Sequence, residues 1–211
     1  MDGVSLDKQE STTFLGVLIN ENLRWNNHVQ NISKIISRNV GILCKLKHYV
    51  PLNILFMLYN SLTLPYISYC NIMWANTKSN VDTILLLQKK AIRVCTNSRY
   101  RDHSNPLFAK LKTLKAGDIN ILQNAIFMFR LQNSQLPSYF PPLFNLNRDI
   151  HSYPTRQTNK FHLRNPKTVL ALKSIRHTGP DIWNSLPIEI RNLNTLYSFK
   201  KAVKTMLLCK Y

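Results

Sequence analysis

Acidic residues are scarce in this 211-residue chain, which has ten Asp and Glu against 28 Lys and Arg and a formal net charge of +18. No two acidic residues are adjacent, so the chain lacks the paired aspartates that hold two Mg²⁺ ions in polymerases. A surface this basic needs a polyanionic partner, and nucleic acid is the usual one. An anionic membrane surface and a merely soluble basic protein stay open as alternatives.

Glycine, cysteine and cofactor motifs are also few. Five Gly and ten Pro argue against collagen-like and loop-dominated folds. Cys44, Cys70, Cys95 and Cys209 are widely spaced and form no CxxC, which favours a reducing compartment. There is no GxGxxG, P-loop or GxSxG, so we expect no cofactor and no nucleophilic serine. Cys44 and His48, four residues apart, are only half of a zinc site, and we predict no bound metal.

A signal peptide and a clear membrane span are both lacking. The N-terminal residues MDGVSLDKQE have no basic region followed by an apolar one, which predicts an intracellular protein of the nucleus or cytoplasm, not a secreted one. Residues 49–77 carry no charge, yet Pro51, Pro65 and several Asn and Ser interrupt them. A buried helix broken at Pro65 therefore fits better than a span. The alternative function, a basic helical interaction or membrane-associated protein, rests on this segment.

What the chain does have is apolar periodicity. Residues 11–19 are β-branched and apolar with Gly16 inside, which predicts a strand with close backbone approach at the glycine. Helical spacing follows over 27–47, with a core face of Val29, Ile32, Ile36, Val40 and Leu43. Further helices are expected over 51–64, 81–95, 104–114 with Ser104 as cap, and 118–132. The predicted fold is mainly α, a helical bundle with a short N-terminal β-strand or hairpin.

Composition changes at Gln135. Residues 135–178 are predicted to be an irregular, basic, Pro-containing arm between a strand-plus-helices domain (1–134) and short C-terminal helices (179–211) that pack back on the bundle. These helices are expected to begin at Gly179–Pro180, at Pro187, and after Ser198 as the cap of 199–209.

Basic residues on the outer faces of the helices carry the functional signal. Lys34, Arg38 and Lys45 lie opposite the core face of their helix, and a basic loop follows the third helix. The predicted nucleic-acid contacts in these parts are Lys34, Arg38, Lys45, Lys89, Lys90, Arg93, Arg99 and Arg101. Tyr100 and Trp25 are available for stacking, whereas Trp74 and Trp183 are expected in the core. Asp102–His103 is not expected to be catalytic, since adjacent loop side chains usually point apart.

Five segments occur in an order that resembles a known family. They are FLGVLINENLRWNNHV (14–29), LYNSLTLPYISYCNIMWAN (58–76), LQKKAIRVCTNSRYRDHSNPLF (87–108), HSYPTR (151–156) and GPDIWNSLPIEIRNLNTLYSFKKAVKTML (179–207). Together they resemble the C-terminal part, thumb and post-thumb, of reverse transcriptases of LINE-type (non-LTR) retrotransposons. The resemblance extends over residues 11–208.

The resemblance implies a thumb-like bundle that holds an RNA template and a DNA primer by their phosphates. Leu15 and Gly16 would lie close to the primer, and Arg24 belongs to the same motif. The fingers, the palm with its catalytic aspartates and any endonuclease would lie upstream of Met1, and a C-terminal zinc knuckle is absent. The expected function is therefore a nucleic-acid-binding fragment of an RNA-directed DNA polymerase, completed by the upstream parts of the same polyprotein and inactive alone.

Overall fold

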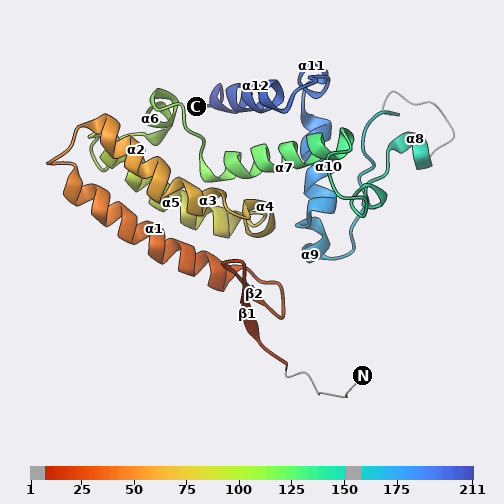
Figure 1. The fold of residues 1–211 in the computed structure, drawn as a ribbon, viewed down its shortest axis with the longest axis horizontal. Coiled ribbons are helices and arrows are strands. Elements are labelled where there is room, and N and C mark those ends of the chain that lie inside the picture. The colour runs from red at the N-terminus through yellow and green to blue at the C-terminus, as the bar shows by residue number, and fades with distance from the viewer. Residues whose placement is uncertain (1–7, 151–157) are drawn as a thin grey trace.

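The computed structural model describes residues 8–150 and 158–211, so the HSYPTR motif lies outside the described residues. The fold is mainly helical with an antiparallel hairpin of β1 (Ser11–Phe14) and β2 (Val17–Asn20) at its N-terminal end (Figure 1). The N-terminal bundle consists of α1 (Asn26–Leu46), α2 (Leu52–Leu62), α3 (Leu64–Ser68), α4 (Asn71–Trp74), α5 (Lys78–Cys95) and α6 (Ser104–Lys110). After it come α7 (Ala116–Gln132), the 3₁₀ turn η1 (Pro141–Leu143), α8 (Asn147–Ile150), α9 (Val169–Leu172), α10 (Ile175–Ser185), α11 (Ile188–Arg191) and α12 (Leu196–Leu208).

The hairpin turns at Leu15 and Gly16. Both residues have positive φ, 46° and 78°, the backbone that a two-residue turn between antiparallel strands requires. Phe14 therefore pairs with Val17, and the glycine lies in the turn instead of inside one continuous strand. Leucine is a costly residue at positive φ, and its carbonyl accepts a hydrogen bond of 2.7 Å from the hydroxyl of Tyr69 on the bundle. This bond ties the tip of the hairpin to the helices.

The core of the bundle is mainly aliphatic, with Tyr59, Trp74 and Phe108 also fully buried. α1 packs along α5, and α2 packs against both helices. The predicted core face of α1 is confirmed, since all five of its residues are buried. Residues 49–77 fold as three short helices, and Leu55, Tyr59 and Ile67 bring their side chains into the core. Within 8–150 and 158–211, no helix combines the length and apolarity needed to cross a membrane.

Gln88 joins three elements in the interior of the bundle. Its side-chain N–H groups donate to the hydroxyl of Tyr59 and to the carbonyl of Leu114, both at 2.9 Å. Its Oε1 accepts from the backbone N–H of Ala116 at 2.8 Å, so a side chain of α5 caps the first turn of α7. A fully buried amide is stable here because both its donor and its acceptor have partners.

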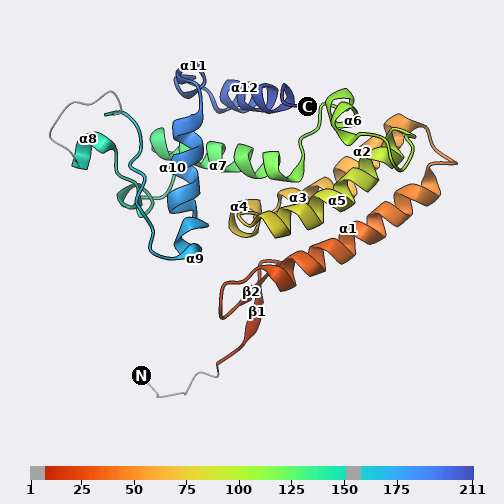
Figure 2. The ribbon, with the colours of Figure 1, turned by 180° about the vertical axis from the view of Figure 1, so that it is seen from behind.

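The C-terminal helices pack on α7 around aromatic rings. Trp183 is buried on α10, and its ring stacks at 5.7 Å on Phe199 of α12, which in turn contacts Phe129 of α7 at 4.7 Å. α10 crosses α7 closely at Gly179, where a Cβ would lie 2.8 Å from the sulfur of Met128. Figure 2, which views the molecule from behind, shows α10 crossing in front of α7 and α12 lying above α7.

Predictions about the start or the cap are wrong for three helices, α10, α12 and α6. α10 begins at Ile175 and holds Pro180 in its interior, where burial of Gly179, Pro180 and Trp183 offsets the missing backbone hydrogen bond. It therefore also runs across the predicted boundary at 178.

The other two errors concern caps. α12 begins at Leu196 because the side chain of Thr195 accepts from the N–H of Ser198, so the threonine is the cap and the serine lies inside the first turn. Ser104 is the first residue of α6 and caps nothing; His103 precedes the helix without a side-chain cap.

An amide network joins the C-terminal helices to the bundle. The Asn120 side chain on α7 donates to the carbonyl of Asn71 and to Oδ1 of Asn76, both at 3.1 Å. The Asn76 amide in turn donates to the carbonyl of Lys173, at 2.7 Å. Because these groups are half-buried or buried, the hydrogen bonds fix how α4, α7 and the end of α9 sit together.

Candidate nucleic-acid interface

Most cations of the described chain have no acidic partner. Within it, two ion pairs form, Lys8 with Glu21 and Arg148 with Asp149. No other Lys or Arg of that part forms an ion pair with a described acidic side chain. A folded surface with so little internal neutralisation attracts polyanions over its whole extent, and local shape must then decide where they bind.

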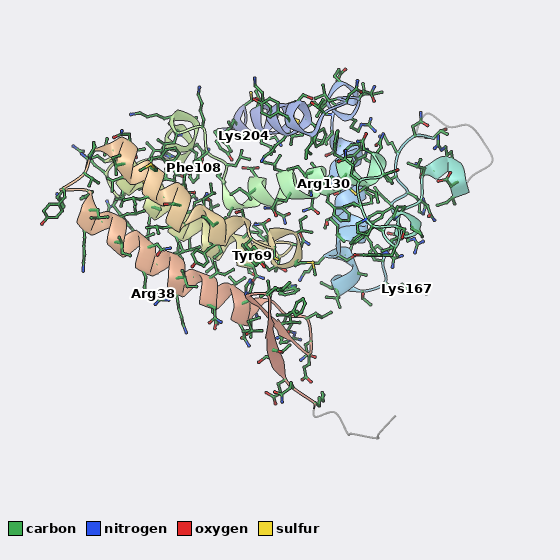
Figure 3. All side chains as sticks on the ribbon, in the orientation of Figure 1. Arg38, Tyr69, Phe108, Arg130, Lys167 and Lys204 are labelled. Atoms are coloured by element: carbon green, nitrogen blue, oxygen red, sulfur yellow. The ribbon has the colours of Figure 1, made fainter. Side chains whose placement is uncertain are left out.

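The outer face of α1 is exposed as its periodicity predicts. Lys34, Arg38 and Lys45 are all exposed, and Figure 3 shows Arg38 pointing away from the molecule at its outer edge. Lys204 on α12 is labelled at the opposite edge. The two basic helices thus form separate surfaces.

A pocket of about 370 Å³ opens between α1 and α5, and we call it the α1/α5 pocket. Each helix contributes residues about one turn apart, and the loop after α5 closes one side. The lining residues are Val40, Cys44, Lys47, Lys90, Arg93, Val94, Asn97, Ser98 and Tyr100. Three of them are cations, and among the described residues that line the pocket none is acidic. Positive charge in a concave site focuses the potential more strongly than the same charge on a convex helix.

Arg93 is held in place within the pocket. Its Nε and one terminal nitrogen donate to the carbonyl of Asp102 at 3.1 and 3.0 Å, and its guanidinium lies 6.0 Å from the centre of the Tyr100 ring. The carboxylate of Asp102 accepts from the N–H of Arg99 at 2.7 Å, so it is turned to the loop backbone. Arg93 therefore both builds the loop and adds its charge to the pocket.

The loop itself is tied to the end of α5. Asn97 takes the left-handed backbone (φ 50°), and the N–H of Ser98 returns to the carbonyl of Arg93 at 2.9 Å. The hydroxyls of Thr96 and Ser98 are 2.8 Å apart. These bonds order the segment that presents Tyr100, whose side chain is 75% exposed.

The structure brings together only part of the predicted set. Lys90 and Arg93 line the pocket, while Arg99 and Arg101 lie exposed on the following loop. Lys89 is half-buried and acts on Lys115, whose pKa is lowered first by burial and further by the Lys89 charge, while Asp118 raises it. Lys89 thus belongs to the side of α5 that faces the start of α7.

Lys47 is the cation that sequence reasoning missed. It follows Val40 by seven residues and Cys44 by three, and this spacing places it on the side of α1 that faces α5. The buried Val40 could have indicated that side. The predicted cations of α1, Lys34, Arg38 and Lys45, lie opposite the core face instead.

Leu15, Gly16 and Arg24 lie at the other end of α1. Gly16 lines a larger cavity of about 840 Å³ between the hairpin, α1, α3 and α7. No Lys or Arg of the described chain lines it. Leu15 and Arg24 are exposed, and the backbone N–H of Arg24 donates to Oδ1 of Asn20 at 2.6 Å. The hairpin residues therefore form a group of their own, apart from the basic pocket.

His28 anchors the hairpin at this end. Its Nδ1 accepts a 3.3 Å hydrogen bond from the N–H of Leu18, which assigns the proton of the neutral ring to Nε2. Burial lowers the pKa of His28 below its usual value. Trp25 and Trp74 contact the ring edge to face, at 6.5 and 6.3 Å. Trp74 and Trp183 are buried, as expected, while Trp25 is half-buried.

The candidate metal ligands are Cys44 and His48, and the candidate acid–base pair is Asp102–His103. Cys44 and His48 are both exposed, and the four cysteines are free. Across 8–150 and 158–211, no three His, Cys, Asp or Glu side chains gather where they could hold a metal ion. The carboxylate of Asp102 accepts a hydrogen bond from the loop backbone at Arg99, and His103 is exposed.

Comparison with known proteins gives no relative. No family model matches the chain, and no curated protein or solved structure matches it significantly.

Proposed function

We propose that this chain binds nucleic acid through phosphate contacts centred on the α1/α5 pocket. The observation that carries the proposal is the convergence of Lys47, Lys90 and Arg93 on one concave site without an acidic side chain in its described lining. Lysine and arginine bind phosphate by charge and by N–H donation, and each neutralised phosphate releases counterions. An aromatic ring at the same site adds a surface for a base.

The wider proposal is that the chain is the C-terminal thumb and post-thumb region of a LINE-type reverse transcriptase. It would hold an RNA template and a DNA primer inside the cell, in the nucleus or cytoplasm, beside fingers and palm supplied by the same polyprotein. Supporting it are the order of the sequence motifs and a helical bundle that follows a hairpin. Because the ten acidic residues are dispersed, we propose no polymerase activity for the chain alone.

The membrane-associated alternative has less support. It depends on residues 49–77, where Leu55, Tyr59 and Ile67 are fully buried in the bundle, while Tyr49, Met57 and Met73 are exposed but scattered among polar residues. Apolar surface already used for packing contributes nothing to binding a lipid surface.

Salt titration of binding tests the phosphate proposal. Fluorescence anisotropy with a labelled single-stranded oligonucleotide should give a slope of log affinity against log salt near −3.5, for on the order of five neutralised phosphates. Lys47→Gln with Lys90→Gln should flatten that slope by about 0.7 if both lysines hold one phosphate, and by about 1.4 if each holds its own.

The matched control removes the same charge from the opposite edge, by Lys200→Gln with Lys204→Gln on α12. It should leave the slope unchanged. A salt-independent affinity, or no binding at about 50 mM salt, contradicts nucleic-acid binding. Equal effects of the two pairs contradict the assignment to the pocket.

A further inference from the structure

We propose that the α1/α5 pocket takes one unpaired nucleotide, with its phosphate on Lys47 and Lys90 and its base stacked on Tyr100. The chain would then prefer single-stranded nucleic acid to duplex of the same sequence. This inference rests on the proposed function and adds to it a class of substrate, because phosphate contacts alone do not distinguish one strand from two.

The size of the pocket favours a single nucleotide. Its volume of about 370 Å³ lies near the lower end of small-molecule sites, which range from about 300 to 1,000 Å³. Its two walls are helices packed against each other, and a duplex cannot enter between them. A single nucleotide displaced from its neighbours can. Val40 and Val94 give the pocket an apolar part suited to a sugar or base edge.

The charges of the pocket favour a phosphate. Lys47 directly follows α1, Lys90 belongs to α5, and both are exposed, so their ammonium groups can reach one phosphate from two directions. Arg93 has already committed two N–H donors to Asp102, which leaves its other terminal nitrogen and its full positive charge. No carboxylate among the described lining residues competes for these cations.

Tyr100 makes the site selective for unpaired bases. Its ring is 75% exposed, and Arg93 lies 6.0 Å from the ring centre. Inside a duplex each base is covered on both faces by its neighbours, so it cannot stack on a protein ring without leaving the helix. An unpaired base has a free face, and stacking on an aromatic side chain contributes about 1–3 kcal/mol. Because hydrogen bonds already order the loop after α5, less conformational entropy is lost when a base stacks on Tyr100.

The test compares one oligonucleotide as a single strand and as a blunt duplex, by fluorescence anisotropy at the same salt concentration. Wild-type protein should bind the single strand more tightly. Tyr100→Ala should weaken single-strand binding by about five- to 150-fold and leave duplex binding unchanged. Tyr100→Phe keeps a stacking ring and should bind as wild type does. Tyr197→Ala removes another exposed tyrosine, on α12, and should change neither affinity.

Thermal melts confirm that each variant is folded, and Tyr100 is exposed enough to be replaced without disturbing the core. Equal wild-type affinity for strand and duplex overturns the inference, and so does an equal loss on both substrates in Tyr100→Ala. Either result leaves phosphate binding standing if the salt slope persists. Absence of binding to both substrates overturns the proposed function together with the inference.

Discussion

The two ends of α1 carry cavities of opposite character. At its N-terminal end, hairpin, α3 and α7 surround about 840 Å³, with Gly16, His28 and Tyr69 in the lining and no Lys or Arg from the described residues. At its C-terminal end, α5 and its loop surround about 370 Å³ with three cations. The larger cavity is thus the uncharged one. For a chain of net charge +18, the place where cations converge indicates the binding site better than cavity volume does.

The difference follows from what each end must satisfy. The N-terminal end docks a two-stranded hairpin, whose tip and second strand rely on hydrogen bonds to Tyr69 and His28. A charge there would lack a partner and lose its solvation. The C-terminal end meets a loop whose backbone Arg93 stabilises directly. Because α1 has 21 residues, about 30 Å separates the two ends. One end can therefore be perturbed without the other.

The largest expected effect comes from Gln88, which joins α2, α5 and the start of α7 in the interior of the bundle. Gln88→Leu leaves the N–H of Ala116 and the carbonyl of Leu114 without their partner in a fully buried place. Each such orphaned group costs about 1–3 kcal/mol, so we expect the free energy of unfolding to fall by about 2–6 kcal/mol. Urea unfolding followed by circular dichroism measures it.

Gln123→Leu is the matched control, since Gln123 is half-buried and its side chain donates one hydrogen bond of 2.7 Å to the carbonyl of Ser68. The free energy of unfolding should fall clearly less in Gln123→Leu than in Gln88→Leu. A loss in Gln88→Leu no larger than in the control would show that the buried amide does not hold α2, α5 and α7 together.

A smaller effect is expected at the hairpin end alone, and it depends on pH. Burial lowers the pKa of His28 in the folded protein, whereas the unfolded chain protonates near pH 6.5. Above that pH both states are neutral. As the pH falls below about 6.5, the unfolded state binds the proton first, so stability decreases by at most about 1.4 kcal/mol per pH unit until the folded pKa is reached. Protonation also removes the acceptor for the Leu18 N–H.

Thermal melts at about pH 7.5 and about pH 5.5 measure this dependence. His28→Asn should show a smaller shift between the two conditions, because asparagine does not titrate. His103→Asn, at an exposed histidine, should shift as wild type does. An identical pH shift in His28→Asn and wild type would mean that other groups cause it.

Helix periodicity made much of this arrangement predictable. The seven-residue spacing of Val29, Ile36 and Leu43 predicts the core face of α1 correctly, because burial on one side of a helix imposes that spacing. The start predicted at Gly179–Pro180 is wrong. Proline is common in the first turn of a helix, but here tertiary packing keeps Pro180 in the interior of α10.

The α1/α5 pocket was not predictable from local pattern. It requires Lys47 and Lys90, more than 40 residues apart, to meet across two packed helices. No rule of residue spacing predicts a contact between side chains from two separate helices. The same limit applies to His28, whose role depends on a strand ten residues earlier folding back onto it.

The smallest expected effect on stability concerns the cations between the two ends. Lys34, Arg38 and Lys45 are exposed along the outer face of α1, so replacing all three by Gln should change the unfolding free energy by no more than about 0.5 kcal/mol each. If the strand bound at the pocket continues along α1, the same variant loses three phosphate contacts. Its salt slope on a single strand should then flatten by about 2.

Lys200, Lys201 and Lys204 are the control, because replacing them by Gln removes the same charge from α12, which lies at the edge of the molecule opposite α1 (Figure 1). An effect of the α1 triple alone extends the interface from the pocket toward the hairpin end. An unchanged slope in both triples confines binding to the pocket itself. Equal flattening in both would mean that net charge, not the difference between the two ends of α1, determines binding, since long-range attraction does not depend on which face supplies it.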